Sequence, residues 1–146
     1  FIRKGQDMTS ITGEKMHANH ILLALDQVRR LYNLSIVEQF RVAPDFEACC
    51  YDIYVEFNTD VSDELLRDEV IPALDQALAQ VNVEYAQKRA SGRLQSPRLH
   101  LMRPGWAEDE RRQFVATGKR DTQYKWQILC PEQRSEDSQA ILHTIK

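Results

Sequence analysis

The chain has 146 residues, a net charge of −3 and a hydrophobic fraction of 42%, which predicts one globular domain that buries roughly two-thirds of its unfolded surface. No apolar run approaches the ~20 residues of a membrane span and no segment resembles a signal peptide, so we expect no membrane association. Three cysteines (Cys49, Cys50 and Cys130) are an odd number at spacings that suit neither a disulfide framework nor a zinc knuckle, and we expect reduced thiols in a cytoplasmic protein.

The N-terminal half predicts extended segments, a helix and a hairpin. Residues 1–4 and 9–12 form two short extended pieces around a turn at 5–7. Because Phe1 opens directly into this segment with no initiator Met, we expect a partner domain upstream. Apolar residues then recur at helical spacing over 14–32. Two runs rich in β-forming residues follow, 34–42 and 48–57, and predict a hairpin.

The C-terminal half begins with a helix signal at Ser62, whose side chain can cap a helix with an acidic first turn. Pro72 predicts a kink or restart, after which the helix runs to about 89. A strand over 99–102, a helix over 106–116 and a last strand over 124–129 complete a domain of residues 1–130. We expect 131–146 to be a polar tail with at most a loose helical turn.

This order of elements predicts an α+β fold: β-hairpin, α, β, β, α, β, α, with helices packed on a small, mainly antiparallel sheet. Without its first hairpin strand, the order is similar to the βαββαβ pattern of ferredoxin-like domains. That pattern hosts many functions, so the order of elements alone does not decide between them.

Charge is unevenly distributed along the chain. Residues 37–83 hold 11 acids and 2 bases, whereas 84–127 hold 10 bases and 5 acids. The basic stretch could favour an anionic ligand such as a nucleotide phosphate, or its arginines could simply balance the acidic stretch.

Lys125 is the residue with the most suggestive neighbours, because Gln123 and Tyr124 precede it directly. A lysine in this setting can donate to a phosphate and to a carbonyl oxygen, and so stabilise charge on a transferring group. Residue type alone favours the plainer interpretation, in which a surface lysine discourages pairing at a strand edge.

Other candidate sites are weaker. Asn82, Tyr85 and Arg89 share one side of a helix, which favours a structural role. His17 and His20 have a spacing that metal ligands use, but no supporting ligand stands nearby, so we expect no metal site. The chain has no glycine-rich phosphate loop, so a nucleotide would have to be bound mostly by another part of the protein.

Two motifs together resemble a known family. The opening Phe1-Ile2-Arg3-Lys4-Gly5-Gln6-Asp7-Met8-Thr9-Ser10-Ile11-Thr12-Gly13-Glu14-Lys15 resembles the start of the C-terminal domain of adenylate-forming enzymes. Its ending is most similar to the Gretchen Hagen acyl-acid amido synthetases of plants and their bacterial relatives. Further similarities follow in order at 54–57, 74–78, Gly105, Gly118 and 123–125, so the resemblance covers residues 1–130.

The resemblance implies a two-step reaction. ATP and a carboxylic acid give an acyl-adenylate and pyrophosphate, and an amine, usually of an amino acid, then gives an amide and AMP. This domain would be the mobile C-terminal lid, inactive alone. A larger N-terminal adenylation domain would hold most of the ATP, its Mg²⁺ and the acyl acid. No nucleic acid is expected as a partner.

The resemblance also assigns roles to individual residues. Lys125 would be the catalytic cation, and Gly13, Glu14 and Lys15 would form a lid loop. The residues expected to contact nucleotide or phosphate are Gln123, Tyr124, Lys119 and Arg120. The hinge between the two domains would be Gln6 and Asp7.

The chain departs from the family pattern after Lys125, where Trp126, Gln127 and Ile128 replace a small residue, proline and a base. This departure leaves the substrates open. Two alternatives also stay open: the lid of a thioester-forming ligase, and a stand-alone ferredoxin-like domain that binds a small molecule. RNA is disfavoured because the clearest strand carries Asp52 and Glu56 rather than exposed aromatic residues with basic flanks.

Overall fold

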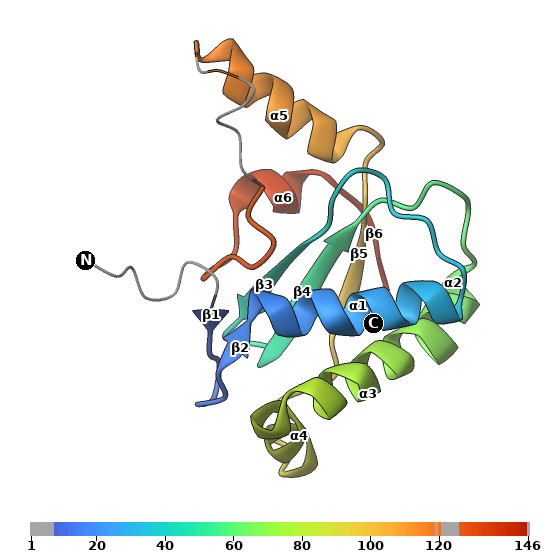
Figure 1. The fold of residues 1–146 in the computed structure, drawn as a ribbon, viewed down its shortest axis with the longest axis vertical. Helices are drawn as coiled ribbons and strands as arrows, with labels where there is room; N and C mark the ends of the chain where they lie inside the picture. Colours follow the sequence, from blue (N-terminus) through green and yellow to red (C-terminus); the bar gives the residue numbers. More distant parts are fainter. Residues whose placement is uncertain (1–7, 119, 121–125, 146) are drawn as a thin grey trace.

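The main structural element is a four-stranded sheet. A computed structural model describes residues 8–118, 120 and 126–145. In it, β3 (Arg41–Asp45), β4 (Cys50–Val55), β5 (Arg98–Met102) and β6 (Ile141–Ile145) lie side by side in that order. Only the β4–β5 pair is parallel (Figure 1). The predicted class, α+β with a mainly antiparallel sheet, is confirmed.

A short N-terminal hairpin lies outside the main sheet: β1 (Met8–Thr9) pairs with β2 (Met16–His17) in a separate two-stranded sheet, and residues 10–15 connect them. Residues 1–7 lie outside the described residues, so the predicted strand 1–4 and turn 5–7 are not tested. Among the described residues, β2 stays out of the main sheet, so the strand order β3-β4-β5-β6 differs from the predicted ferredoxin-like arrangement. Because Met16 and His17 are extended in β2, helix α1 (Ala18–Leu31) begins four residues later than predicted.

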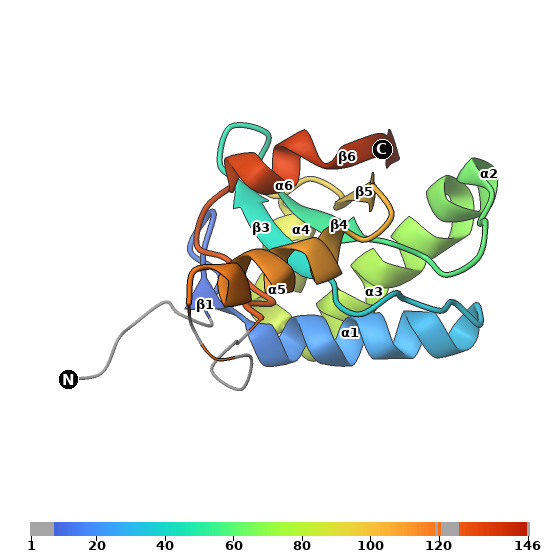
Figure 2. The same cartoon turned by 90° about the horizontal axis from the view of Figure 1, so that it is seen from above.

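Helices cover both faces of the sheet (Figures 1 and 2). On one face α1 packs against α3 (Ile71–Val81), and alternate strand residues such as Tyr51, Ile53 and Val55 point into their apolar core. On the other face, Trp106 and Ala107 of α5 (Trp106–Ala116) cover a smaller apolar cluster around Tyr54. Ala140, which directly follows α6 (Ser135–Gln139), is also buried in this cluster.

Pro72 explains an irregular helix. The helical run begins as α2 (Asp63–Leu65), passes through a π-helical segment, η1 (Leu66–Val70), and continues as α3. Proline lacks an N–H and its ring crowds the carbonyl four residues earlier, here that of Asp68, so the backbone before it widens into π geometry. The predicted helix therefore continues through Pro72 with a local distortion.

Asn82 divides what we predicted as one helix into α3 and α4 (Val83–Ala90). Its extended backbone ends α3, and its side chain accepts a hydrogen bond from Tyr85 N at 3.0 Å, which caps α4. The three residues predicted to have a structural role do have one. Tyr85 is buried, and both its hydroxyl and the Arg89 guanidinium bind Asp75 of α3.

The ends of the sheet differ from the predictions. β3 extends through Pro44, and the hairpin turn is 46–49. Residues 124 and 125 of the predicted last strand lie outside the described residues, and 126–129 contribute only the bridge between Leu129 and Val42. The segment expected to be a polar tail contains α6 and β6, which pairs with β5. Within the described part of the chain, none of the helices has the length and apolarity needed to cross a membrane.

Asn82→Ala is expected to lower the free energy of unfolding by about 1–3 kcal/mol, because it removes the α4 cap and leaves buried backbone groups unsatisfied. Ser62→Ala removes an exposed cap, on Leu65 N, and should cost less, about 0.5–1 kcal/mol. Urea unfolding followed by circular dichroism measures both. Equal losses would show that Asn82 acts only as a cap.

Candidate functional site

The structure describes part of the predicted site. Lys125, Gln123, Tyr124 and Lys119 lie outside the described residues, as do Gln6 and Asp7. Arg120 is described and exposed. The predicted lid loop Gly13, Glu14 and Lys15 is described in full. The described part of the predicted site therefore consists of this loop and Arg120, and the residues that follow Lys125 are also described.

Glu14 holds the β1–β2 loop in place from inside. Its side chain is fully buried, and its carboxylate accepts hydrogen bonds from Ile11 N (2.9 Å), Thr12 N (2.9 Å) and Thr12 Oγ1 (2.8 Å). It also accepts one from the Tyr51 hydroxyl of β4. A buried carboxylate is stable only when its oxygens are satisfied in this way. Glu14 therefore shapes the loop and ties it to the sheet.

These hydrogen bonds set the ionisation of both partners. Burial opposes a charge on Glu14, but the donors of Tyr51, Ile11 and Thr12 outweigh it and lower the pKa of the carboxyl below its ordinary value. Burial, followed by the hydrogen bond to Glu14 and the proximity of its charge, raises the pKa of Tyr51 far above the ordinary value. Glu14 is thus the anion and Tyr51 the neutral donor at neutral pH.

The loop has a second anchor on α4. Lys15 N donates to Glu84 Oε1 at 3.1 Å, and the Asn82 amide donates to the Lys15 carbonyl at 2.8 Å. Gly13 has a φ of +108°, a conformation that favours glycine. The loop is thus fixed between the sheet and the helical layer, with the Lys15 side chain exposed.

Arg41 fixes the residues that directly follow Lys125. Its side chain is 1% exposed, and its guanidinium binds Glu110 of α5 at 2.9 Å and Asp137 of α6 at 3.0 Å. Its Nε donates to the Gln127 carbonyl at 3.0 Å. The guanidinium carbon also lies 3.9 Å from the centre of the Trp126 ring, a cation–π distance.

Trp126 is held on three sides. Besides Arg41 on its face, its indole N–H donates to the Phe40 carbonyl at 2.6 Å, and the Trp106 ring meets it edge-on with centres 5.1 Å apart. Trp126, which departs from the family pattern and directly follows the predicted catalytic Lys125 in the sequence, is therefore held in one position.

A buried polar network below β4 was not predicted. Asp52 binds Arg98 Nε at 2.7 Å and lies 2.9 Å from His100 Nε2, and Arg98 also binds Asp45 at 2.6 Å. The His100 ring stacks on Tyr54. Burial raises the pKa of Asp52, but His100 and Arg98 lower it more, so the net shift is downward. The sequence did contain a signal for this network. Because Asp52 stands between Tyr51 and Ile53, which face the α1 and α3 core, its side chain lies on the opposite, also buried, face of the sheet.

Much of the basic stretch is neutralised within the fold. Arg89 and Arg98 are paired with acids of the acidic stretch, and Arg103, Arg111 and Arg112 lie within 3.7 Å of acids on α5. The pairs of Arg89 and Arg98 thus balance part of the acidic stretch, whereas the pairs on α5 form between residues of the basic stretch itself.

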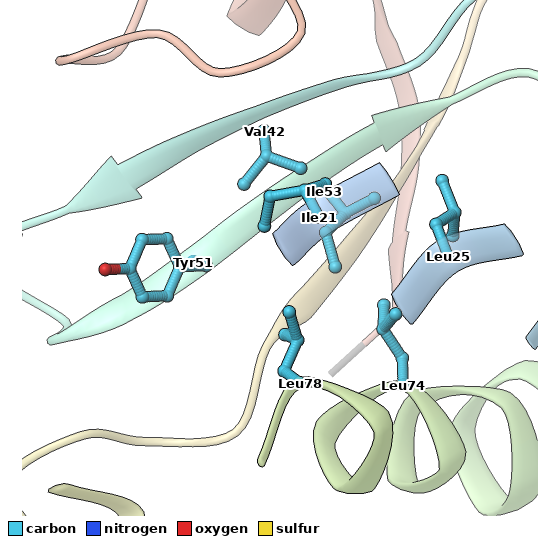
Figure 3. A pocket seen from close by; sticks show the side chains of 7 residues that line it. All are labelled: Ile21, Leu25, Val42, Tyr51, Ile53, Leu74 and Leu78. Carbon is cyan, nitrogen blue, oxygen red and sulfur yellow. The ribbon is translucent and has the colours of Figure 1, made fainter. Parts of the chain in front are cut away.

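Two further features carry no ligand chemistry. A cavity of about 10 Å³ between α1, α3 and the sheet is lined by apolar chains and the Tyr51 ring (Figure 3), so it is a small packing gap with room for a single water at most. In the described ranges, no group of three His, Cys, Asp or Glu side chains could hold a metal ion. His20 Nδ1 instead accepts a hydrogen bond from His17 N at 3.0 Å.

Comparison with known proteins extends this picture. Residues 19–134 match the model of the GH3 family C-terminal domain. Among solved structures, the fold is similar to that of a GH3.15 acyl acid amido synthetase, with a TM-score of 0.76 and 16% identity over 99% of this chain and 28% of that chain. A second solved structure, AtGH3.15 acyl acid amido synthetase in complex with 2,4-DB, matches with a TM-score of 0.73 and 18% identity. This match covers 94% of this chain and 26% of that chain. The chain thus spans about a quarter of those proteins, and no curated protein sequence matches it.

Glu14→Gln is expected to lower the free energy of unfolding at pH 7 by about 1–3 kcal/mol, because an amide nitrogen replaces an acceptor oxygen. Since the folded pKa of Glu14 is below its ordinary 4.5, the contribution of its charge is present above that value and is lost as the pH falls through the folded pKa. Urea unfolding at pH 7 and pH 3 should therefore show a difference from wild type that shrinks in acid. The exposed Glu132→Gln is the control, and a pH-independent difference would contradict the assignment.

Arg41→Ala is expected to lower the free energy of unfolding by about 3–5 kcal/mol, because it leaves two carboxylates without their buried cation. Arg41→Lys, which keeps the charge but loses the planar fork, should lie between it and wild type. Arg30→Ala breaks an ion pair whose arginine is 75% exposed and should cost at most about 1 kcal/mol. Denaturant unfolding ranks the three, and a loss at Arg41→Ala no larger than at Arg30→Ala would refute the role of Arg41.

Proposed function

Because the chain belongs to the GH3 family and matches its C-terminal domain, we propose that it is the catalytic lid of an ATP-dependent acyl-acid amido synthetase. The observation that carries this proposal is a fold similar over 99% of the chain to a protein of that description. In the proposed enzyme, a larger N-terminal adenylation domain binds ATP, Mg²⁺ and the carboxylic acid. The lid alone is expected to be inactive. Free Cys49, Cys50 and Cys130 thiols fit a reducing, cytoplasmic location.

The proposed reaction has two balanced steps. A carboxylate oxygen attacks the α-phosphorus of ATP, the bond to the β-phosphate oxygen breaks, and pyrophosphate leaves. An amine nitrogen then attacks the acyl carbon, the carbon–oxygen bond to AMP breaks, and the nitrogen loses a proton as the amide forms. Lys125 would stabilise the negative charge that develops at the α-phosphate in the first step. The proposed contacts Gln123, Tyr124, Lys119 and Arg120 would help to hold the phosphates.

Two structural features support a lid that moves as one body. Glu14 fastens the loop 10–15 to β4, and Arg41 of β3 fastens Trp126 and Gln127. β3 and β4 are paired along their length, so both segments rest on the same rigid support. A rotation about the proposed hinge at Gln6 and Asp7 would then carry both together, as rigid-body closure requires.

Lys125→Ala in the full-length enzyme is expected to lower pyrophosphate release by about 10²- to 10³-fold, as when one preorganised charge stabiliser is removed. The assay supplies ATP and a panel of carboxylic acids, with and without amino acids. Arg67→Ala, which removes a half-exposed cation on the π-helical segment, is the matched control and should keep the wild-type rate.

The same assay separates the alternatives. Acid-dependent release that is lost in Lys125→Ala, with an amide formed when an amino acid is added, supports the proposal. Transfer to a pantetheine thiol instead would make the enzyme a thioester-forming ligase. Equal release by wild type and Lys125→Ala would remove Lys125 from catalysis.

A further inference from the structure

A groove beside Trp126 has the composition of a small-molecule site. Its lining comes from three separated segments: Glu38 and Gln39 before β3, Ala107 and Arg111 on α5, and Trp126 itself. We call it the Trp126 groove. Its volume is about 210 Å³, below the ~300–1,000 Å³ of pockets for drug-sized ligands. A ligand that fills it is therefore small, of the size of a single amino acid rather than a peptide or a nucleotide.

One wall of the Trp126 groove is rigid before any ligand arrives. The indole is fixed by its hydrogen bond to the Phe40 carbonyl and by the Arg41 guanidinium on its face. Ala107 is buried and small. An aromatic wall that needs no reordering offers apolar contact at a low entropic cost.

Charged groups of opposite sign complete the lining. Glu38 is exposed, and its φ of +61° is a left-handed conformation that is uncommon for a side chain of this type. Such backbone strain tends to persist where a side chain must be held in one place for function. Arg111 is half-buried, and its guanidinium lies 3.6 Å from Glu108. A guanidinium binds a carboxylate through charged, often paired N–H donors, which is the chemistry that an amino-acid carboxylate requires.

We propose that the Trp126 groove binds the α-amino acid that accepts the acyl group. The ligand ammonium would lie at Glu38 and lose a proton to solvent before its nitrogen attacks the acyl carbon. Its carboxylate would lie at Arg111 and its side chain against the Trp126 indole. This inference rests on the proposed function, because only an amide-forming enzyme needs an amine acceptor. Trp126, which lines the groove, directly follows Lys125 in the sequence. This adjacency is what a lid that takes part in both half-reactions would require.

Steady-state amide formation by the full-length enzyme tests the proposal, with an amino acid and its methyl ester as paired acceptors. Wild type should have a KM for the free amino acid about 10-fold or more below that for the ester, since a charged hydrogen bond is lost in the ester. Arg111→Gln should abolish this preference. Glu38→Gln should raise KM for both acceptors alike, because both carry the ammonium.

Arg112→Gln is the matched control. Arg112 follows Arg111 on α5 and also pairs with Glu108, at 3.2 Å, but its side chain is 68% exposed and it does not line the groove. It should keep the wild-type preference for the free amino acid. Damage to α5 would affect both arginine variants, whereas loss of a carboxylate contact affects only Arg111→Gln.

The outcomes distinguish this inference from the proposed function. Acid-dependent pyrophosphate release, measured without an acceptor, tests adenylation alone. If the wild type adenylates and forms amides but Arg111→Gln keeps its preference for the free amino acid, the groove assignment is wrong and the proposed function stands. If the wild type does not adenylate, or transfers only to a thiol, both are overturned.

Discussion

The burial of the Arg41 guanidinium positions the elements on one face of the sheet. Arg41 sits on an edge strand with its side chain 1% exposed, and a buried cation is tolerated only with close, well-oriented acceptors. The acceptors are 69 and 96 residues away along the chain, on α5 and α6. Satisfying Arg41 therefore draws two helices and the 126–127 segment onto the same face of the sheet. The opposite face is covered mainly by the apolar packing of α1 and α3.

Glu14 applies the same logic with the opposite charge. A buried carboxylate collects donors from its own loop and from Tyr51, and so converts a short hairpin into a fixed feature of the sheet. Both charged centres lie beside segments that the family resemblance singles out. The parts of the domain proposed to meet substrate are thus held by polar contacts, which specify geometry more tightly than apolar packing alone.

Features with local signals could be predicted from the sequence. The bounds of α5 match because Pro104-Gly105 and Gly118 flank a continuous helical pattern, and the Ser62 cap was predicted for the same reason. Features that depend on distant partners could not. β6 looks like a short apolar run in a polar tail until β5 pairs with it, and Arg41 looks like an ordinary base on a strand until Asp137 and Glu110 reach it. Glu14 belonged to the predicted lid loop, but its burial depends on Tyr51, 37 residues away. The roles of Lys125 and its neighbours stay predictions.

The pairing of β3 with β4 also limits how this domain can be recombined. Each strand carries the anchor of one proposed functional segment: Tyr51 for the β1–β2 loop, Arg41 for the residues after Lys125. A chimera that took only one segment from a relative would separate a buried charge from its counterpart across the junction. A chimera that exchanges each segment together with its strand is therefore expected to keep these contacts, and exchange of the whole domain keeps both.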